Sequence, residues 1–215
     1  MTVQSTVSNP EARWPVLVAL IGVGAITLSL PDSLVVGPRW LLLALVLVLL
    51  IPATLAHRTG WHEIDKVLGY IVSGIVTAAL AASLGLLIFD LPKMTQSPTS
   101  LLRSAAMLWV TNVLVFAVWY WRLDAGGPHQ REKRRAHTAG AFFFPQMMGG
   151  APVENAETWS PRFVDYLFLA FNTSTALSPT DTAILSRWAK MLSMLQALIS
   201  LSIVAILASR AVGML

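Results

Sequence analysis

Residues 163–182 read FVDYLFLAFNTSTALSPTDT, an apolar run that gives way to hydroxyls, an amide and an acid. A longer apolar run, Met191 to Val212, follows it. Backbone that leaves helical geometry at membrane depth is tolerated only where protein or a watery cavity satisfies its polar groups. We therefore predict a helix–break–helix hairpin in the membrane over residues 161–215, and we expect its break to be a functional position.

The composition of the whole chain indicates that the lipid bilayer is its solvent. Of 215 residues, 55% are hydrophobic and only 12% are charged, whereas about a quarter of the residues in soluble domains are charged. Cysteine is absent from the sequence, which excludes disulfides and thiol chemistry. The net charge of +4 is carried mostly at the ends of apolar runs and in one loop, which favours membrane orientation over nucleic-acid binding.

Four apolar stretches precede the hairpin, and each is about long enough to cross the hydrocarbon as a helix. They are Trp14 to Leu30, Trp40 to Leu55, Leu68 to Phe89 and Leu101 to Trp121. Tryptophans lie near their ends, at the headgroup level that indole rings prefer. The first run is longer than that of a secretory signal, so we interpret it as a retained anchor. The fold class is predicted as an all-helical transmembrane bundle, with residues 1–121 forming a four-helix region.

The third stretch has a small residue at every fourth position. The series is Gly69, Ser73, Thr77, Ala81 and Gly85. Small residues let another backbone approach closely, which is how membrane helices associate when lipid offers no hydrophobic contrast. This stripe is therefore predicted to be a helix-packing face.

Residues 122–160 form a polar loop with a basic cluster made of Arg131, Lys133, Arg134 and Arg135. The positive-inside rule makes this loop cytoplasmic, and four crossings back along the chain place the amino terminus there too. We expect the cluster to contact anionic lipid headgroups. Residues 142–150 are too short and too broken by proline and glycine to span, so they are expected to lie on the interface or against the bundle.

Seven polar residues of the carboxy-terminal segment are candidates for lining a pore or a binding site. They are Asn172, Thr173, Thr175, Ser178, Thr180, Asp181 and Gln196. A plainer interpretation of residues 178–181 is a helix start, because they supply a serine cap, a proline and an acid in the right order. Gln196, like Asn112 in the fourth stretch, is expected to form an interhelical hydrogen bond, with a pore-lining position as the alternative.

Two topologies are open for the hairpin. Residues 163–178 either re-enter the membrane or cross it as a further helix with the break facing outward. The pore loop of a channel enters from outside, whereas the charges put residues 122–160 inside. We therefore favour the crossing version, which leaves Arg210 in the cytoplasm.

The hairpin resembles the pore helix, filter and inner helix of two-transmembrane potassium channels. Thr173, Thr175 and Asp181 fit the frame of the filter motif, Leu177 fits its valine, and Arg187 fits a basic residue that follows it. Ser178, Pro179 and Thr180 stand where that family has glycine, tyrosine and glycine. The resemblance implies a pore loop, but these residues resist the dihedrals of a potassium-selective carbonyl filter.

The chain also resembles an uncharacterised family of bacterial multi-pass membrane proteins. The shared elements are residues 121–128, 144–146, 165–171 and 178–182. This resemblance implies a location in the bacterial inner membrane and brings no established activity.

Elsewhere the sequence offers weak signs of chemistry. His57, His62, Glu63 and Asp65 gather in one short segment, but their spacing matches no zinc signature and a solvated loop is the simpler interpretation. No catalytic motif occurs, so we expect neither an enzyme nor a cofactor. The functional hypothesis is an oligomeric ion-conducting pore built from several copies of the chain. The alternative is a non-conducting membrane scaffold or partner subunit.

Overall fold

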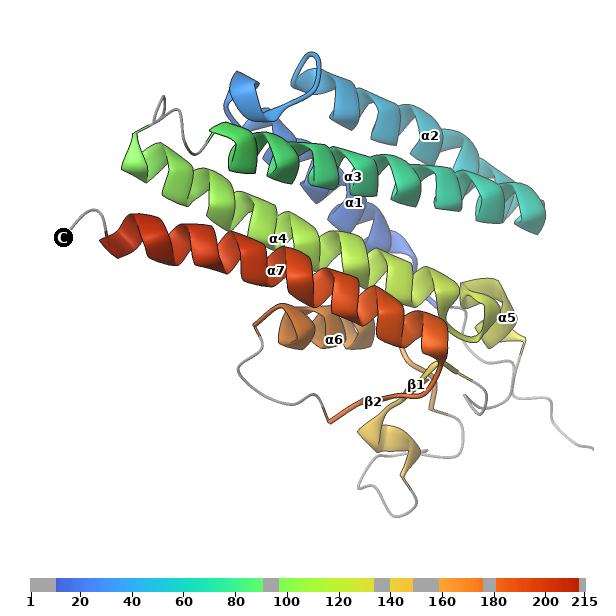
Figure 1. Cartoon of the computed structure of the whole chain (residues 1–215). Helices are drawn as coiled ribbons and strands as arrows, with labels where there is room; N and C mark the ends of the chain where they lie inside the picture. The colour runs from blue at the N-terminus through green and yellow to red at the C-terminus, as the bar shows by residue number, and fades with distance from the viewer. Residues whose placement is uncertain (1–10, 91–96, 134–139, 149–158, 176–180, 213–215) are drawn as a thin grey trace, which may run out of the picture.

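A computed structural model describes residues 11–90, 97–133, 140–148, 159–175 and 181–212, with the side chains of the last three left out. Within them the chain forms seven α-helices and one small antiparallel sheet (Figure 1). The helices are α1 (Trp14–Leu28), α2 (Trp40–Arg58), α3 (His62–Asp90), α4 (Pro98–Leu123), α5 (Pro128–Glu132), α6 (Phe163–Thr175) and α7 (Arg187–Val212), and the strands are β1 (Phe142–Phe143) and β2 (Ala183–Ile184). The predicted all-helical bundle is confirmed.

Four helices in the described residues are long and apolar enough to cross a membrane. These spans are Trp40–Arg58, His62–Asp90, Pro98–Gly126 and Arg187–Ser209. Their outer faces carry exposed apolar side chains, among them Ile51, Phe89 and Leu201, as expected of surfaces that face lipid. Helix α1 is apolar but has 15 residues, or about 22 Å, which is short of the hydrocarbon thickness. The chain thus fits a multi-pass membrane protein.

Helix α4 lies at the centre of the bundle and packs against α1, α3, α6 and α7 (Figure 1). Helices α1, α2 and α3 pack on one another on one side of it, and α6 packs against α7 on the other. Helices α1 and α3 begin, and α2 and α4 end, at the same end of the bundle. This cationic end carries Arg13, Arg58, Lys66 and Arg122.

The small-residue stripe of α3 turns gradually from the inside of the bundle to its surface. Gly69 and Ser73 are buried and Thr77 is half-buried, but Ala81 and Gly85 are exposed. The reason is geometric: a step of four residues overshoots the 3.6-residue turn, so the stripe rotates by about 40° per step. The helix packs with the first part of the stripe, and its second part faces outward in the single chain.

Helix α6 runs only halfway along α4. At its start, the Tyr166 hydroxyl donates to an Asp124 carboxylate oxygen over 2.6 Å. At its end, Ser174 accepts a 3.4 Å hydrogen bond from the amide of Asn112, near the middle of α4. The 13 residues of α6 cover about 20 Å. The chain then returns, because Trp188 at the start of α7 packs on Phe142 beside the last turn of α4.

This path contradicts the favoured topology in which residues 163–178 cross the membrane. Helix α7 starts at the cationic end and runs antiparallel to α4 (Figure 1), so Arg210 lies at the opposite end from Arg122 and not on the same side. The physical reason is length, since α6 is too short to span about 30 Å of hydrocarbon. The re-entrant alternative is the one that fits the described residues.

Residues 142–147 pack against the bundle, which is one of the two positions predicted for this segment; the other was the membrane interface. Strand β1 pairs with β2, with Phe142 opposite Ile184, and the Phe142 ring is fully buried between Tyr120 and Tyr166. The pairing changes the start of the last helix. Residues 181–186 are not helical, and α7 begins at Arg187 with the Ser186 hydroxyl accepting from the Ala189 amide. The predicted helix start over residues 178–181 is therefore wrong.

Arg131 is buried, which contradicts its predicted contact with lipid headgroups. Its guanidinium forms an ion pair with Glu11 at 3.1 Å, donates to the Trp121 carbonyl at 2.6 Å and lies over the Tyr166 ring. A buried arginine is stable only when paired in this way. Lys133 is exposed, so its contact with anionic lipid headgroups stays a prediction. Arg134 and Arg135 lie outside the described residues.

Candidate functional site

The structure places the predicted pore residues on different elements, although Thr173 of α6 and Gln196 of α7 both interact with the Tyr120 hydroxyl. Asn172, Thr173 and Thr175 are the last residues of helix α6 and not part of a break. Asp181 is exposed just before β2. Ser178 and Thr180 lie outside the described residues.

Gln196 is fully buried at the contact of α4, α6 and α7. Its amide donates to the Ala170 carbonyl at 2.7 Å and to the Ser174 hydroxyl at 2.8 Å. Its carbonyl oxygen accepts from the Tyr120 hydroxyl at 2.5 Å. Asn112 donates to the Gln196 backbone carbonyl at 3.3 Å in the same cluster. Both amides thus form the interhelical hydrogen bonds expected of them, and the bonds of Gln196 are made within one chain.

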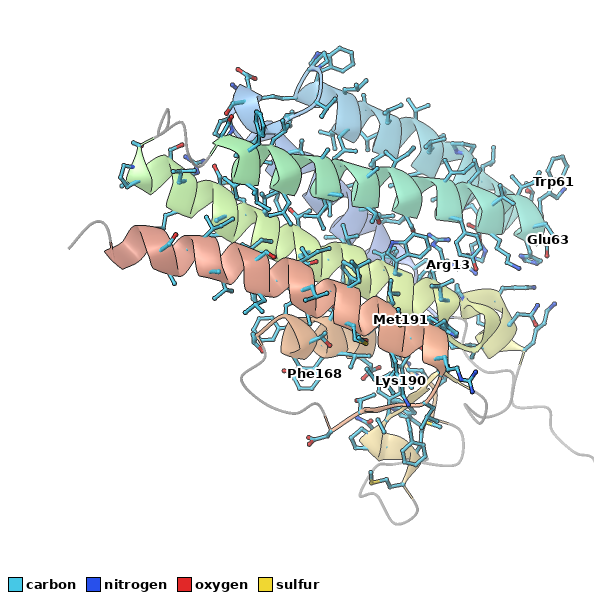
Figure 2. The ribbon with its side chains drawn as sticks, viewed as in Figure 1. Arg13, Trp61, Glu63, Phe168, Lys190 and Met191 are labelled. Carbon is cyan, nitrogen blue, oxygen red and sulfur yellow. The ribbon has the colours of Figure 1, made fainter. Side chains whose placement is uncertain are left out.

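A cavity of about 240 Å³ lies at the cationic end, between α1, α2, α3, the end of α4 and the start of α5. Four cations, Arg13, Arg58, Lys66 and Arg122, and two acids, Glu63 and Asp65, belong to its described lining. Figure 2 shows Arg13 between the ends of α3 and α4, and Glu63 at the outer end of α3. The cavity is the place where four helix ends bring positive charge together.

The two arginines are held in place by different means. Arg13 forms an ion pair with Asp65, which is also 3.9 Å from an imidazole nitrogen of His57. The guanidinium of Arg122 lies directly over Gly69 of α3, where an added Cβ would overlap with it. Only glycine leaves room for this close approach. Gly69, the first residue of the α3 stripe, therefore lets the guanidinium of Arg122 reach the cavity.

Several nitrogens at the cavity are buried and have no hydrogen-bond partner among the described residues. They are Nε and Nη2 of Arg13, Nε of Arg122, Nδ1 of His57 and His62, and Nε2 of His129. Burying such polar groups without a partner costs free energy, most of all for a guanidinium. Guanidinium groups bind phosphate and carboxylate oxygens through paired hydrogen bonds. The cavity therefore has the chemistry of an anion site.

Histidines form the outer wall of the cavity. The rings of His62 and His129 are stacked, with centroids 3.6 Å apart, and both residues also line an open hollow on the outer surface. Burial lowers the pKa of His129, and the nearby His62 and Lys133 lower it further. His129 is therefore held neutral in a setting that already contains positive charge.

Sequence reasoning found parts of this site without seeing that they meet. The segment from His57 to Asp65 was interpreted as a zinc candidate or a solvated loop, yet its residues belong to the ends of α2 and α3. No group of three or more metal-ligating side chains that could hold an ion occurs in the described residues. No site prediction from the sequence includes Arg13 or Arg122. The available signal was that each flanks an apolar run on the same predicted side of the membrane.

No family model, curated protein or solved structure matches this chain. The class of protein rests on its fold, a helical bundle whose apolar helices fit a multi-pass membrane protein.

Proposed function

We propose that this protein binds an anionic ligand in the cavity at its cationic end. The observation that supports the proposal is the pair of arginines, Arg13 and Arg122, whose buried N–H groups lack acceptors among the described residues. A phosphate or carboxylate in the cavity would accept these hydrogen bonds and offset the excess of cations over acids in the lining. We propose binding without chemical turnover, in the bacterial inner membrane, with the cavity on the cytoplasmic side.

Titration of the purified protein with inorganic phosphate by calorimetry tests this function. Arg122→Gln is expected to weaken binding at least tenfold, because it removes a charge-assisted donor that is buried. Arg162→Gln is the matched control, since Arg162 is exposed and does not belong to the cavity. Absence of binding by the unaltered protein, or equal loss in the two variants, would contradict an anion site in the cavity.

A second function, an oligomeric ion-conducting pore, is supported by the half-length path of α6. The carboxyl end of α6 lies level with Trp109 and Asn112, near the middle of a membrane span. The negative end of a helix dipole at that depth favours a cation, as in pore-loop proteins. In this proposal several copies of the chain bring the carboxyl ends of their α6 helices to one axis, and Asp181 contributes charge at the entrance.

Ion flux into proteoliposomes tests the pore proposal. Asp181→Asn is expected to lower cation flux severalfold, whereas Asp32→Asn, in the exposed loop between α1 and α2, leaves it unchanged. If the reconstituted protein passes no cations, the pore is excluded and the non-conducting alternative stands.

A further inference from the structure

The cavity changes from charged to apolar along its depth. On α1 the lining runs from Arg13 through Val16 and Leu17 to Leu20. On α2 it runs from Arg58 back to Leu50. With a rise of 1.5 Å per residue, these paths are about 10 and 12 Å long. On these two walls the cations therefore lie at the outer end, and the side chains further in are mostly apolar.

The third wall has the same order. On α3 the lining begins with His62 and Lys66 and ends at Tyr70 and Val72, over about 15 Å, with the Arg122 guanidinium over Gly69 about one turn before Val72. Val72 is fully buried, and Ala53 of α2, which also lines the cavity, is nearly so. On all three helices the lining thus begins with charged or polar side chains at the outer end and continues with apolar ones. A site for a small dissolved anion does not require this order.

Taking the anion-binding function as its basis, we infer that the ligand is an amphiphile, with a phosphate-type head on the arginines and a hydrocarbon chain in the inner part. An apolar wall gives nothing to a bare phosphate, but it accommodates a hydrocarbon chain, and for an amphiphile taken up from water each buried CH₂ contributes about fourfold in affinity. The same head chemistry is available from a membrane lipid or from dissolved phosphate. The inner wall favours the lipid source.

Calorimetry in one fixed detergent, with decyl phosphate, inorganic phosphate and decanol as probes, tests the inference. Decyl phosphate is expected to bind at least tenfold more tightly than either of the others. Butyl, hexyl and octyl phosphates are expected to fall between, because affinity grows with the chain length that the inner part accepts. Since the micelle takes up each probe equally in all protein samples, differences between variants report the cavity.

Ala53→Leu is the discriminating variant, because it fills the inner part and leaves both arginines in place. It is expected to remove the preference for decyl phosphate while inorganic phosphate still binds, which also shows that the variant is folded. Equal affinity for decyl and inorganic phosphate, unchanged in Ala53→Leu, would overturn the amphiphile and leave the anion site intact. If decanol binds as well as decyl phosphate, or if no phosphate binds, the head is not recognised and the proposed function itself fails.

Discussion

Gly69 decides whether Arg122 reaches the cavity. Because a Cβ at this position would overlap with the guanidinium, Gly69→Ala should displace Arg122 without removing its charge. We expect phosphate affinity to fall at least tenfold with little loss of folded protein, since the displaced group is the end of a flexible side chain. Calorimetry for binding and a melting curve for stability are the measurements.

Gly74→Ala is the control for this substitution. Gly74 lies on the same helix, and an added Cβ there meets no atom within 4 Å. Phosphate binding should therefore be unchanged in this variant. An equal loss of affinity in both variants would mean that α3 as a whole, and not the position of Arg122, governs binding.

His129 makes the stability of the empty protein depend on pH. Its pKa in the folded chain lies below the ordinary value of histidine, 6.5, so below about pH 6.5 the unfolded chain binds the proton more readily. The free energy of unfolding should then fall as pH drops through that value and below. His129→Gln should flatten the slope in melting curves recorded between pH 5 and 7.5. An unchanged slope in His129→Gln would contradict this role of the imidazole.

At the scale of elements, the half-length helix α6 depends on Gln196. Replacement by leucine removes two donated bonds and leaves the Tyr120 hydroxyl without its acceptor on Gln196, so we expect a loss of about 1–3 kcal/mol in the free energy of unfolding. Denaturation in mild detergent is the measurement. Ser202→Ala on the exposed side of α7 should cost much less, since its hydroxyl bonds only within its own helix. Similar losses in both would show that the buried cluster does not hold α6.

The ends of these elements explain what the sequence could and could not predict. Run length and the tryptophans located α2, α3 and α4 well, because a helix that spans lipid needs a fixed number of apolar residues. The start of α7 was missed because a local capping pattern competes with a distant partner. Strand β2 pairs with Phe142 and Phe143, far earlier in the chain, and no local rule reports such a pairing.

Prediction of the candidate site from the sequence has a similar limit. The sequence showed the cations and histidines but gave no measure of how helix ends converge, so Arg13, Arg122 and His129 appeared unrelated. Their meeting depends on antiparallel packing of α1 to α4, which follows from short connections. A reader of the sequence can predict the common end of these helices, but not the space left between them. The close approach of Arg122 to Gly69 is likewise visible only once α3 and α4 are packed.

At the scale of the whole molecule, the fold fixes which segments share a side of the membrane. The natural chain has no cysteine, so single cysteines can be labelled specifically. Gln130→Cys and Leu185→Cys should react with an impermeant maleimide from one side, and Val36→Cys from the other. The reason is that α6 enters and returns at the cationic end, whereas the loop between α1 and α2 lies at the opposite end. Labelling of Leu185→Cys and Val36→Cys from the same side of the membrane would contradict a re-entrant α6 and support an α6 that crosses.

The short length of α6 also imposes an order on biosynthesis. A 13-residue segment is too short to be held in the bilayer by its own hydrocarbon, and its buried carbonyls at Ala170 and Ser174 take bonds from Gln196 and Ser200, which the ribosome makes later. Until α7 has emerged, the Ala170 carbonyl lacks its donor on Gln196 and the Ser174 carbonyl lacks its donor on Ser200, although Trp109 of α4 already donates to Ser174. A nascent chain halted before Gln196 would thus hold its first four helices in place and leave its carboxy-terminal part open to proteases.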